Sequence, residues 1–394
     1  MDTLFVVTLF ELFVGGGGRL LEIGPYTTRM ALFALCLLTT VLVALPKGRP
    51  VGGLPLAVAL VTAYLIVHLS ALANGALAGM PLADMFLELQ QSLYWLAAPY
   101  FAVVLDRASM VHRAAAVARV AGIVLAAVYL GAIALLASGV LDFARVYTAM
   151  SESSEFFFRG ESFFFYKGFL YLGIGSVFLV SSGSKRARWL AVVVLTAMAL
   201  TITRGFVIST SVALLLMLAA QRRWRLLGVV AALAIGAAVI VWGLVPSADE
   251  GLSAQREISN QQRIEDMDFI ADNIDARTVL VGRGLGVPIN ERGNVENTLV
   301  WALWRLGLPG VVFWTMPLLI CARYYLLVPR RAADYRLAGA FMFSTLLVYI
   351  QTLSNPYLNN PIGLSFILVA VFSLRTLSRP FTGRRAMSMP GLAA

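Results

Sequence analysis

The chain has few charged residues and few histidines for its length. Only 13% of its 394 residues are Asp, Glu, Lys or Arg, while 59% are hydrophobic. A soluble domain contains about 25% charged residues, so this chain lacks the polar surface that would cover a globule in water. Its two histidines, His68 and His112, are too few for a site built from several imidazoles. The composition therefore excludes a soluble enzyme.

Cysteine is equally scarce. Cys36 and Cys321 lie in separate apolar runs without a second thiol nearby. This spacing excludes a disulfide framework and a CxxC metal site, and we expect both to be buried structural residues. The first apolar stretch also lacks a basic flank and an A-x-A cleavage site, so we interpret it as a short, retained span.

Long apolar runs make up most of the sequence. A helix of about 20 apolar residues crosses the ~30 Å hydrocarbon core of a bilayer. Apolar runs between charged and Gly/Pro-rich breaks predict about twelve spans, centred near residues 3–15, 27–45, 53–73, 84–105, 114–138, 162–182, 187–204, 205–220, 226–245, 296–322, 336–354 and 360–377. We therefore predict an all-α, polytopic membrane protein in which residues 1–394 form one transmembrane domain.

Basic residues are concentrated in alternate connections between these spans. The clusters lie near Lys47, Arg107, Lys185, Arg222, Arg330 and Arg379. By the positive-inside rule these connections are cytoplasmic, and both termini are cytoplasmic with them. The net charge of +10 is then a sign of topology. Nucleic-acid binding is not expected, because the aromatic residues lie mostly in spans instead of alternating with surface basic residues.

The longest connection, residues 246–293, contains more acidic than basic residues and is expected on the external face. Within it, residues 263–276 predict an amphipathic helix whose apolar face would hold Ile264, Met267, Ile270 and Ile274. Asp266 and Asp268 form a D-x-D pattern, which many sugar-nucleotide transferases use to hold a metal. A solvated acidic face is the favoured interpretation, because a metal site needs converging carboxylates.

A glycine-rich segment follows this helix, with Gly282, Gly284 and Gly286 at alternate positions. Glycines allow a backbone to approach another group closely. No strand is predicted before them, so the pattern does not indicate a dinucleotide site.

The next span is predicted to begin at Asn294 as its N-cap, which places Glu296 and Asn297 in its first turn. The helix dipole favours an acid at that position with or without a function. Arg305 lies about two and a half turns further into the span. A charge at that depth needs a partner or a wet cavity.

Three other external cations could be anchors at the interface or ligands for an anion. Arg204, in the stretch Thr201–Gly205, lies on the face where basic residues are scarce. Arg159 lies in the aromatic-rich stretch 156–166, and Lys167 directly follows it. For both residues a role as interfacial anchors is favoured.

The order of these motifs resembles the superfamily of O-antigen ligases and polymerases. The motifs that carry the resemblance are, in order, TRG after a span, Arg263 at the start of an amphipathic helix, G-x-G-x-G, Glu296 with Asn297, and L-G-x-x-G at 306–310. The resemblance covers roughly residues 155–320 at motif level, and the topology agrees over the whole chain. Members are bacterial inner-membrane proteins that transfer glycans from undecaprenyl diphosphate to an acceptor on the periplasmic side.

The resemblance implies a glycosyltransferase-C-like helical architecture, in which residues 246–293 are a periplasmic loop. It also implies a metal-independent reaction that needs no cofactor. The substrate would be an undecaprenyl-diphosphate-linked glycan in the bilayer, and the partners would be a flippase and a chain-length regulator.

The motifs suggest specific roles for these side chains. Arg204 and Arg263 are candidate ligands of the diphosphate, because guanidinium groups can stabilise a leaving group without a metal. Glu296 is the candidate base for the acceptor hydroxyl. Asn297, Arg305 and Arg159 are candidate supporting residues, and Gly282, Gly284 and Gly286 supply loop backbone.

Two alternatives remain at this point. In the family's ligases a His precedes the counterpart of Asn297, so Glu296 favours a polymerase of an exopolysaccharide, capsule or O-antigen. The alternative is a ligase that transfers the finished lipopolysaccharide glycan to lipid A core. A transporter is the alternative from another class, but its charges would be expected near the midplane, whereas those here cluster at the outer surface.

Overall fold

The structure is a computed structural model, and it describes residues 1–16, 22–23, 26–44, 51–151, 156–159, 163–239, 250–289 and 295–387. Helices make up most of this part of the chain. They are α1 (Asp2–Val14), α2 (Thr28–Thr39) with η1 (Thr40–Ala44), α3 (Leu54–Leu77), α4 (Leu82–Ser92), η2 (Leu93–Ala97), α5 (Ala98–Val104), α6 (Ala108–Ala137), α7 (Phe143–Ser151), η3 (Lys167–Phe169), α8 (Leu170–Ser182), α9 (Lys185–Leu200), α10 (Arg204–Ala220), α11 (Trp224–Val239), α13 (Glu250–Asn273), α14 (Ala276–Val281), α15 (Thr298–Leu327), α16 (Tyr335–Gln351) and α17 (Pro361–Met387).

Most of the predicted spans overlap these helices. Four stretches are long and apolar enough to cross a membrane, namely Leu54–Leu77, Ala108–Ala137, Thr298–Leu327 and Pro361–Arg379, and shorter apolar helices accompany them. The chain is therefore a multi-pass helical membrane protein, as the composition predicted. The number of twelve crossings stays a prediction.

The described residues are mostly helical, as predicted, apart from two short hairpins. One pairs β1 (Glu22–Ile23) with β2 (Tyr26–Thr27), and the other pairs β3 (Phe156–Arg159) with β4 (Phe163–Tyr166) in antiparallel register. The span predicted at 162–182 therefore becomes helical only at η3. Phenylalanine and tyrosine favour strands, and the ring of Phe164 packs 5.1 Å from that of Tyr129 on α6.

The span predicted at 84–105 is also interrupted. Its helix ends at Ser92, a tight 3₁₀ segment occupies Leu93–Ala97, and α5 begins anew with Pro99 in its first turn. Proline has no backbone N–H and is accommodated at the start of a helix, where that donor has no partner within the helix.

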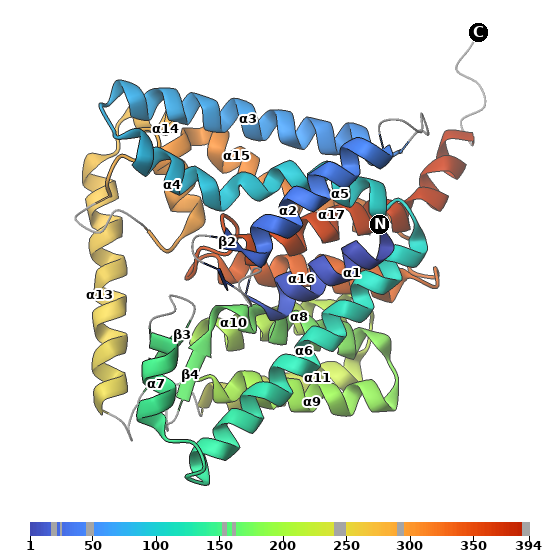
Figure 1. Cartoon of the computed structure of the whole chain (residues 1–394). Coiled ribbons are helices and arrows are strands. Elements are labelled where there is room, and N and C mark those ends of the chain that lie inside the picture. The colour runs from blue at the N-terminus through green and yellow to red at the C-terminus, as the bar shows by residue number, and fades with distance from the viewer. Residues whose placement is uncertain are drawn as a thin grey trace.

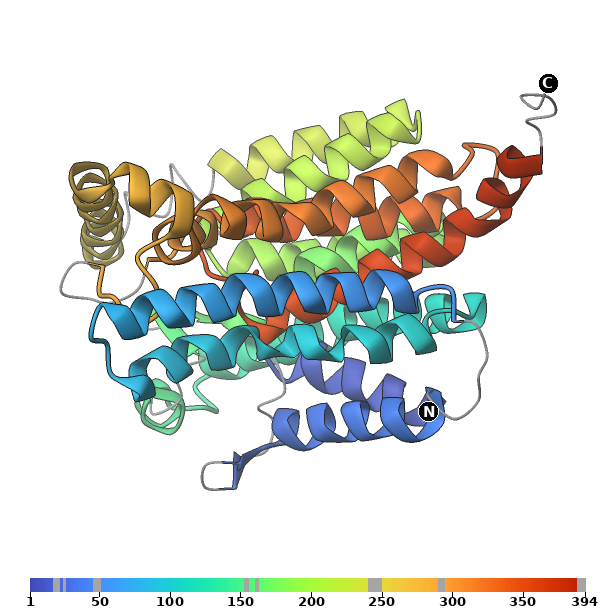
Figure 2. The same ribbon diagram turned by 90° about the horizontal axis from the view of Figure 1, so that it is seen from above.

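The long helices run in the same general direction, and α13 lies across one end of the bundle (Figures 1 and 2). Within α17, 94% of the most apolar stretch is buried by other parts of the chain. The corresponding stretches of α3 and α6 are only 28% buried. We call the end that carries α13 the α13 end.

Ion pairs join several of the connections that carry basic residues. Away from α13, Arg107 and Arg113 pair with Asp2, and Arg379 pairs with Asp106. The N-terminus and the C-terminal part of α17 also lie at this end (Figure 1). These residues belong to connections predicted to be cytoplasmic. The assignment of each end to one side of the membrane remains a prediction.

Candidate active site at the α13 end

Two of the predicted site residues are in direct contact. The Nε of Arg263, on α13, donates a hydrogen bond to Oε2 of Glu296 at 2.7 Å, and the two charges form an ion pair. The side chains are 43% and 48% exposed, so a ligand at the surface can reach both. The structure thus joins the candidate diphosphate ligand to the candidate base, although 33 residues separate them in the chain.

A small apolar cluster holds α13 against the start of α15. Ile270 packs with Ile289, Val295 and Trp304, and the ring of Phe269 lies 5.8 Å from that of Trp304. Arg263 and Ile270 are two turns apart and therefore share a helix face. The contact between Arg263 and Glu296 is positioned by this packing.

This packing corrects the predicted apolar face of the amphipathic helix. Ile264 is 61% exposed and Met267 is 43% exposed, whereas Asp266 is buried. The face turned towards the protein is the one that carries Arg263, Asp266 and Ile270. Asp266 and Asp268 differ in environment, since Asp268 is exposed. They are about 200° apart around the helix, so they do not converge on one point.

The predicted boundaries of this helix were also wrong. The helix α13 begins at Glu250 and ends at Asn273, and a separate short helix, α14, begins at Ala276. Asp275 is the N-cap of α14 and accepts hydrogen bonds from the N–H and the hydroxyl of Thr278, both at 2.6 Å. The hydroxyl of Thr278 is the main cause that lowers the pKa of Asp275 below its usual value.

Asn297, and not Asn294, caps α15. Its Oδ1 accepts from the N–H groups of Leu299 at 3.0 Å and Val300 at 3.3 Å. Asn294 lies outside the described residues. Glu296 therefore precedes the cap instead of lying in the first helical turn, and Asn297 fixes the helix start beside it.

The glycine-rich segment packs between α3 and α15. The N–H of Gly284 donates to the carbonyl of Arg305 at 3.1 Å, and the N–H of Leu285 donates to the carbonyl of Ala71 at 3.0 Å. Gly282 lies against the backbone of Arg305 and Gly307. The helix α15 is kinked at Gly307, which has a positive φ of 67°. The G-x-G-x-G and L-G-x-x-G motifs thus contact each other, and the close approach of the glycines is to protein backbone.

Arg305 has the partner that its depth requires. Its guanidinium pairs with Glu88 on α4, and the side chains are 1% and 14% exposed. The second carboxylate oxygen of Glu88 accepts from the N–H of Gly286 at 2.9 Å. This ion pair therefore connects α4, the glycine-rich segment and α15.

Glu88 and Arg283 were not among the predicted site residues. The guanidinium of Arg283 lies 4.8 Å above the ring of Trp304, and its Nε donates to the hydroxyl of Thr278 at 3.1 Å. It also donates to the carbonyl of Asn273, which joins the end of α13 to α14. A signal for Glu88 existed, because an acid inside a predicted span is a candidate functional residue by default.

Arg204 lies in a different environment, at the first position of α10. Its neighbour Gly205 packs against Gln351 and Ser354 at the end of α16, and the ring of Phe206 is 6.3 Å from that of Tyr357. Arg204 therefore borders the connection 352–360. Arg159 ends strand β3, and its side chain lies outside the described residues.

We expect Gly284→Ala to destabilise the protein by several degrees in melting temperature. Gly284 has a φ of +102°, and an added Cβ would overlap the backbone of Gly75 on α3. Left-handed backbone costs a residue with a Cβ about 1–2 kcal/mol, and overpacking adds about 1–3 kcal/mol. Gly79→Ala is the matched control, because Gly79 also has a positive φ of +76° but has open space around it. Equal melting temperatures for the two purified variants would contradict the packing role.

Comparison with known proteins shows a similarity that extends over the length of the chain. No family model matches the sequence. The chain is 29% identical over 378 residues to an O-antigen polymerase of Shigella flexneri, and the alignment covers 94% of each protein. The similarity therefore extends beyond the motifs to the transmembrane helices. This match confirms the resemblance to the superfamily of O-antigen polymerases and ligases.

Proposed function

We propose that the chain is a polymerase that joins undecaprenyl-diphosphate-linked repeat units into an exopolysaccharide, capsule or O-antigen. The observation that carries this proposal is the similarity over 94% of both chains to an O-antigen polymerase. We place the reaction at the periplasmic face of the bacterial inner membrane. The predicted orientation supports this placement, because the acidic connection and the Arg263–Glu296 pair lie away from the basic connections.

The reaction would transfer a glycan from its diphosphate to a sugar hydroxyl. The bond between the anomeric carbon and the diphosphate oxygen breaks, and the acceptor oxygen forms a new bond to that carbon. The diphosphate leaves with the electron pair and gains negative charge. Arg263 is suited to hold it, because its planar guanidinium is half-exposed and fixed by the packing of α13. Arg204 would be the second ligand.

Glu296 would accept the proton of the acceptor hydroxyl. In the structure its Oε2 is occupied by Arg263. A diphosphate competes with this carboxylate for the same guanidinium, so substrate binding would free Glu296 to accept the proton. This exchange links the availability of the base to the presence of the leaving group. Asn297 supports it by holding the start of α15.

Cellular glycans from a deletion strain would test the proposal. Loss of a polymerase should leave single repeat units on the carrier lipid or one unit on the core. Long chains retained on the carrier lipid would indicate a ligase instead. An unchanged glycan pattern would contradict both activities.

Purified protein with a synthetic lipid-diphosphate glycan would separate an enzyme from a transporter. Release of undecaprenyl diphosphate with lengthening of the glycan supports the polymerase. Movement of the intact lipid across a vesicle membrane without lengthening would contradict it.

A further inference from the structure

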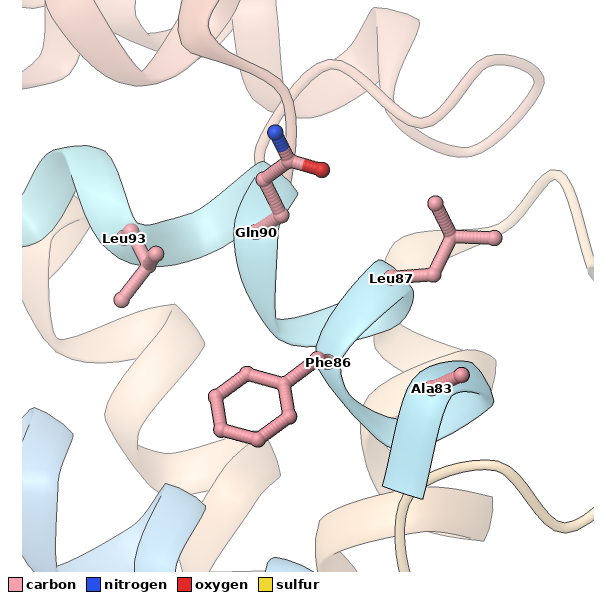
Figure 3. A pocket seen from close by; sticks show the side chains of 5 residues that line it. All are labelled: Ala83, Phe86, Leu87, Gln90 and Leu93. Atoms are coloured by element: carbon pink, nitrogen blue, oxygen red, sulfur yellow. The ribbon is translucent and has the colours of Figure 1, made fainter. Parts of the chain in front are cut away.

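A groove runs along one side of α4, separate from the Arg263–Glu296 pair. One cavity of about 310 Å³ is lined by Ala83, Phe86, Leu87, Gln90 and Leu93 (Figure 3). A second, of about 230 Å³, shares Gln90 and Leu93 and adds Arg29, Met30 and Phe33 of α2 and Pro361 of α17. Because they share two lining residues, the cavities lie next to each other along α4. We call them together the α2–α4 groove.

The groove is apolar and open to the surroundings of the bundle. Phe86 is 52% exposed and Leu87 is 65% exposed. In Figure 3, Phe86 and Leu93 point to one side of the ribbon, whereas Gln90 points away from them. On a membrane protein such exposed apolar side chains contact lipid chains. A hydrocarbon chain can therefore enter the groove sideways, without passing through water.

One end of the groove carries a positive charge. Arg29 lies in the first turn of α2, which begins at the same end of the bundle as α13 (Figure 2). Gln90 of α4 lines the same cavity. An arginine beside an apolar groove is complementary to an amphipathic anion with a phosphate head and a long hydrocarbon tail.

One residue of the second cavity directly follows the connection 352–360, which also contacts α10. That residue is Pro361. Within that connection Tyr357 packs against Phe206, two residues after Arg204. The connection 352–360 therefore contacts the start of α10 and leads directly into Pro361, which lines the same cavity as Arg29. A diphosphate held near Arg204 could have its lipid tail in the groove.

We propose that the α2–α4 groove binds the polyprenyl chain of the lipid-linked substrate, with Arg29 contacting the diphosphate. This assignment rests on the proposed function for the nature of the lipid. The cavity volumes lie near or below the lower limit of ligand pockets, about 300 Å³. Each therefore holds a segment of the chain, and the remainder lies along the exposed apolar residues of α2 and α4.

Photo-crosslinking would test this site without requiring catalysis. The probe is undecaprenyl diphosphate with a diazirine near the diphosphate end of its chain, added to the purified full-length chain. We expect labelled peptides from α2 and α4, and competition by unlabelled undecaprenyl diphosphate. Labelling spread over all the lipid-facing helices, or equal competition by phosphatidylglycerol, would overturn the proposal.

Two variants separate the contributions of the groove and the head group. Ala83→Trp fills the first cavity and should reduce labelling about tenfold, whereas Ala127→Trp on the exposed face of α6 should not. Arg29→Gln should weaken binding of undecaprenyl diphosphate about tenfold but leave the binding of neutral undecaprenol unchanged. Labelling of Ala83→Trp at the wild-type level would overturn the groove assignment.

Size-exclusion chromatography would show that each variant is folded. Because the probe carries no glycan, binding in the groove and polymerase activity are measured separately. Specific binding by a protein that makes no polymer would contradict the proposed function while supporting the groove. Polymerisation with unchanged labelling in Ala83→Trp would contradict only the groove.

Discussion

Glu296→Gln is expected to reduce glycan polymerisation at least a hundredfold while the protein still inserts and folds. The amide keeps an oxygen that can accept from Nε of Arg263, so the 2.7 Å contact can persist. It cannot take the proton of the acceptor hydroxyl, and general base catalysis contributes about 10²–10⁴ to a rate. The measurement is the length distribution of glycans on the carrier lipid, made by purified protein at equal amounts.

Variants of Arg263 distinguish catalysis from a structural contact. Arg263→Ala should also abolish polymerisation, because it removes the proposed diphosphate ligand. Arg263→Lys keeps the charge but loses the planar fork, so we expect partial activity. A purely structural ion pair predicts instead that Glu296→Gln is active and that Arg263→Met with Glu296→Met restores polymer. Wild-type ladders in Glu296→Gln and Arg263→Ala would overturn both site assignments.

Much of the helical arrangement could be predicted from the sequence, because apolar runs and basic connections are local signals. Most of the predicted spans overlap the helices, and contacts such as Arg107 with Asp2 join connections of the same predicted set. Breaks within the spans were harder to predict. The interruption at Leu93–Ala97 and the strand Phe163–Tyr166 both lie in apolar sequence, where hydropathy alone does not distinguish a helix from another structure.

The site could be predicted only in part, because its contacts join distant segments. The sequence singled out Arg263 and Glu296 separately, and their pairing depends on how α13 folds back onto α15. The periodicity predicted the burial of Ile270 correctly but not that of Ile264 and Met267, which are exposed, because Trp304 and Glu296 contact the face that carries Ile270 and Arg263. The glycines were expected to allow a close approach to another group, but the sequence could not show that this group is the backbone of α3 and α15, because those residues are far away in sequence.

Glu88→Ala is expected to cause the largest loss of stability. It would leave the guanidinium of Arg305, which is 1% exposed, without its carboxylate, and the N–H of Gly286 without its acceptor. Removing one partner of a buried ion pair costs about 3–5 kcal/mol, because the remaining charge is still desolvated. We expect little folded protein after solubilisation, measured as the monodisperse fraction in size-exclusion chromatography. Glu88→Gln should be milder, since its amide oxygen can still accept one hydrogen bond.

A double variant tests whether Glu88→Ala is unstable because Arg305 loses its carboxylate partner, or because both side chains are needed in themselves. Glu88→Leu with Arg305→Met removes both charges and keeps a similar volume, so folding should recover relative to Glu88→Ala, because apolar replacements of buried pairs are often tolerated. No recovery would contradict the ion-pair explanation. If the recovered protein polymerises glycans, Glu88 and Arg305 act by joining α4 to α15. If it folds but forms no polymer, the reaction needs the charges of Glu88 and Arg305 in addition to the Arg263–Glu296 pair. Arg305 then does more than join α4 to α15.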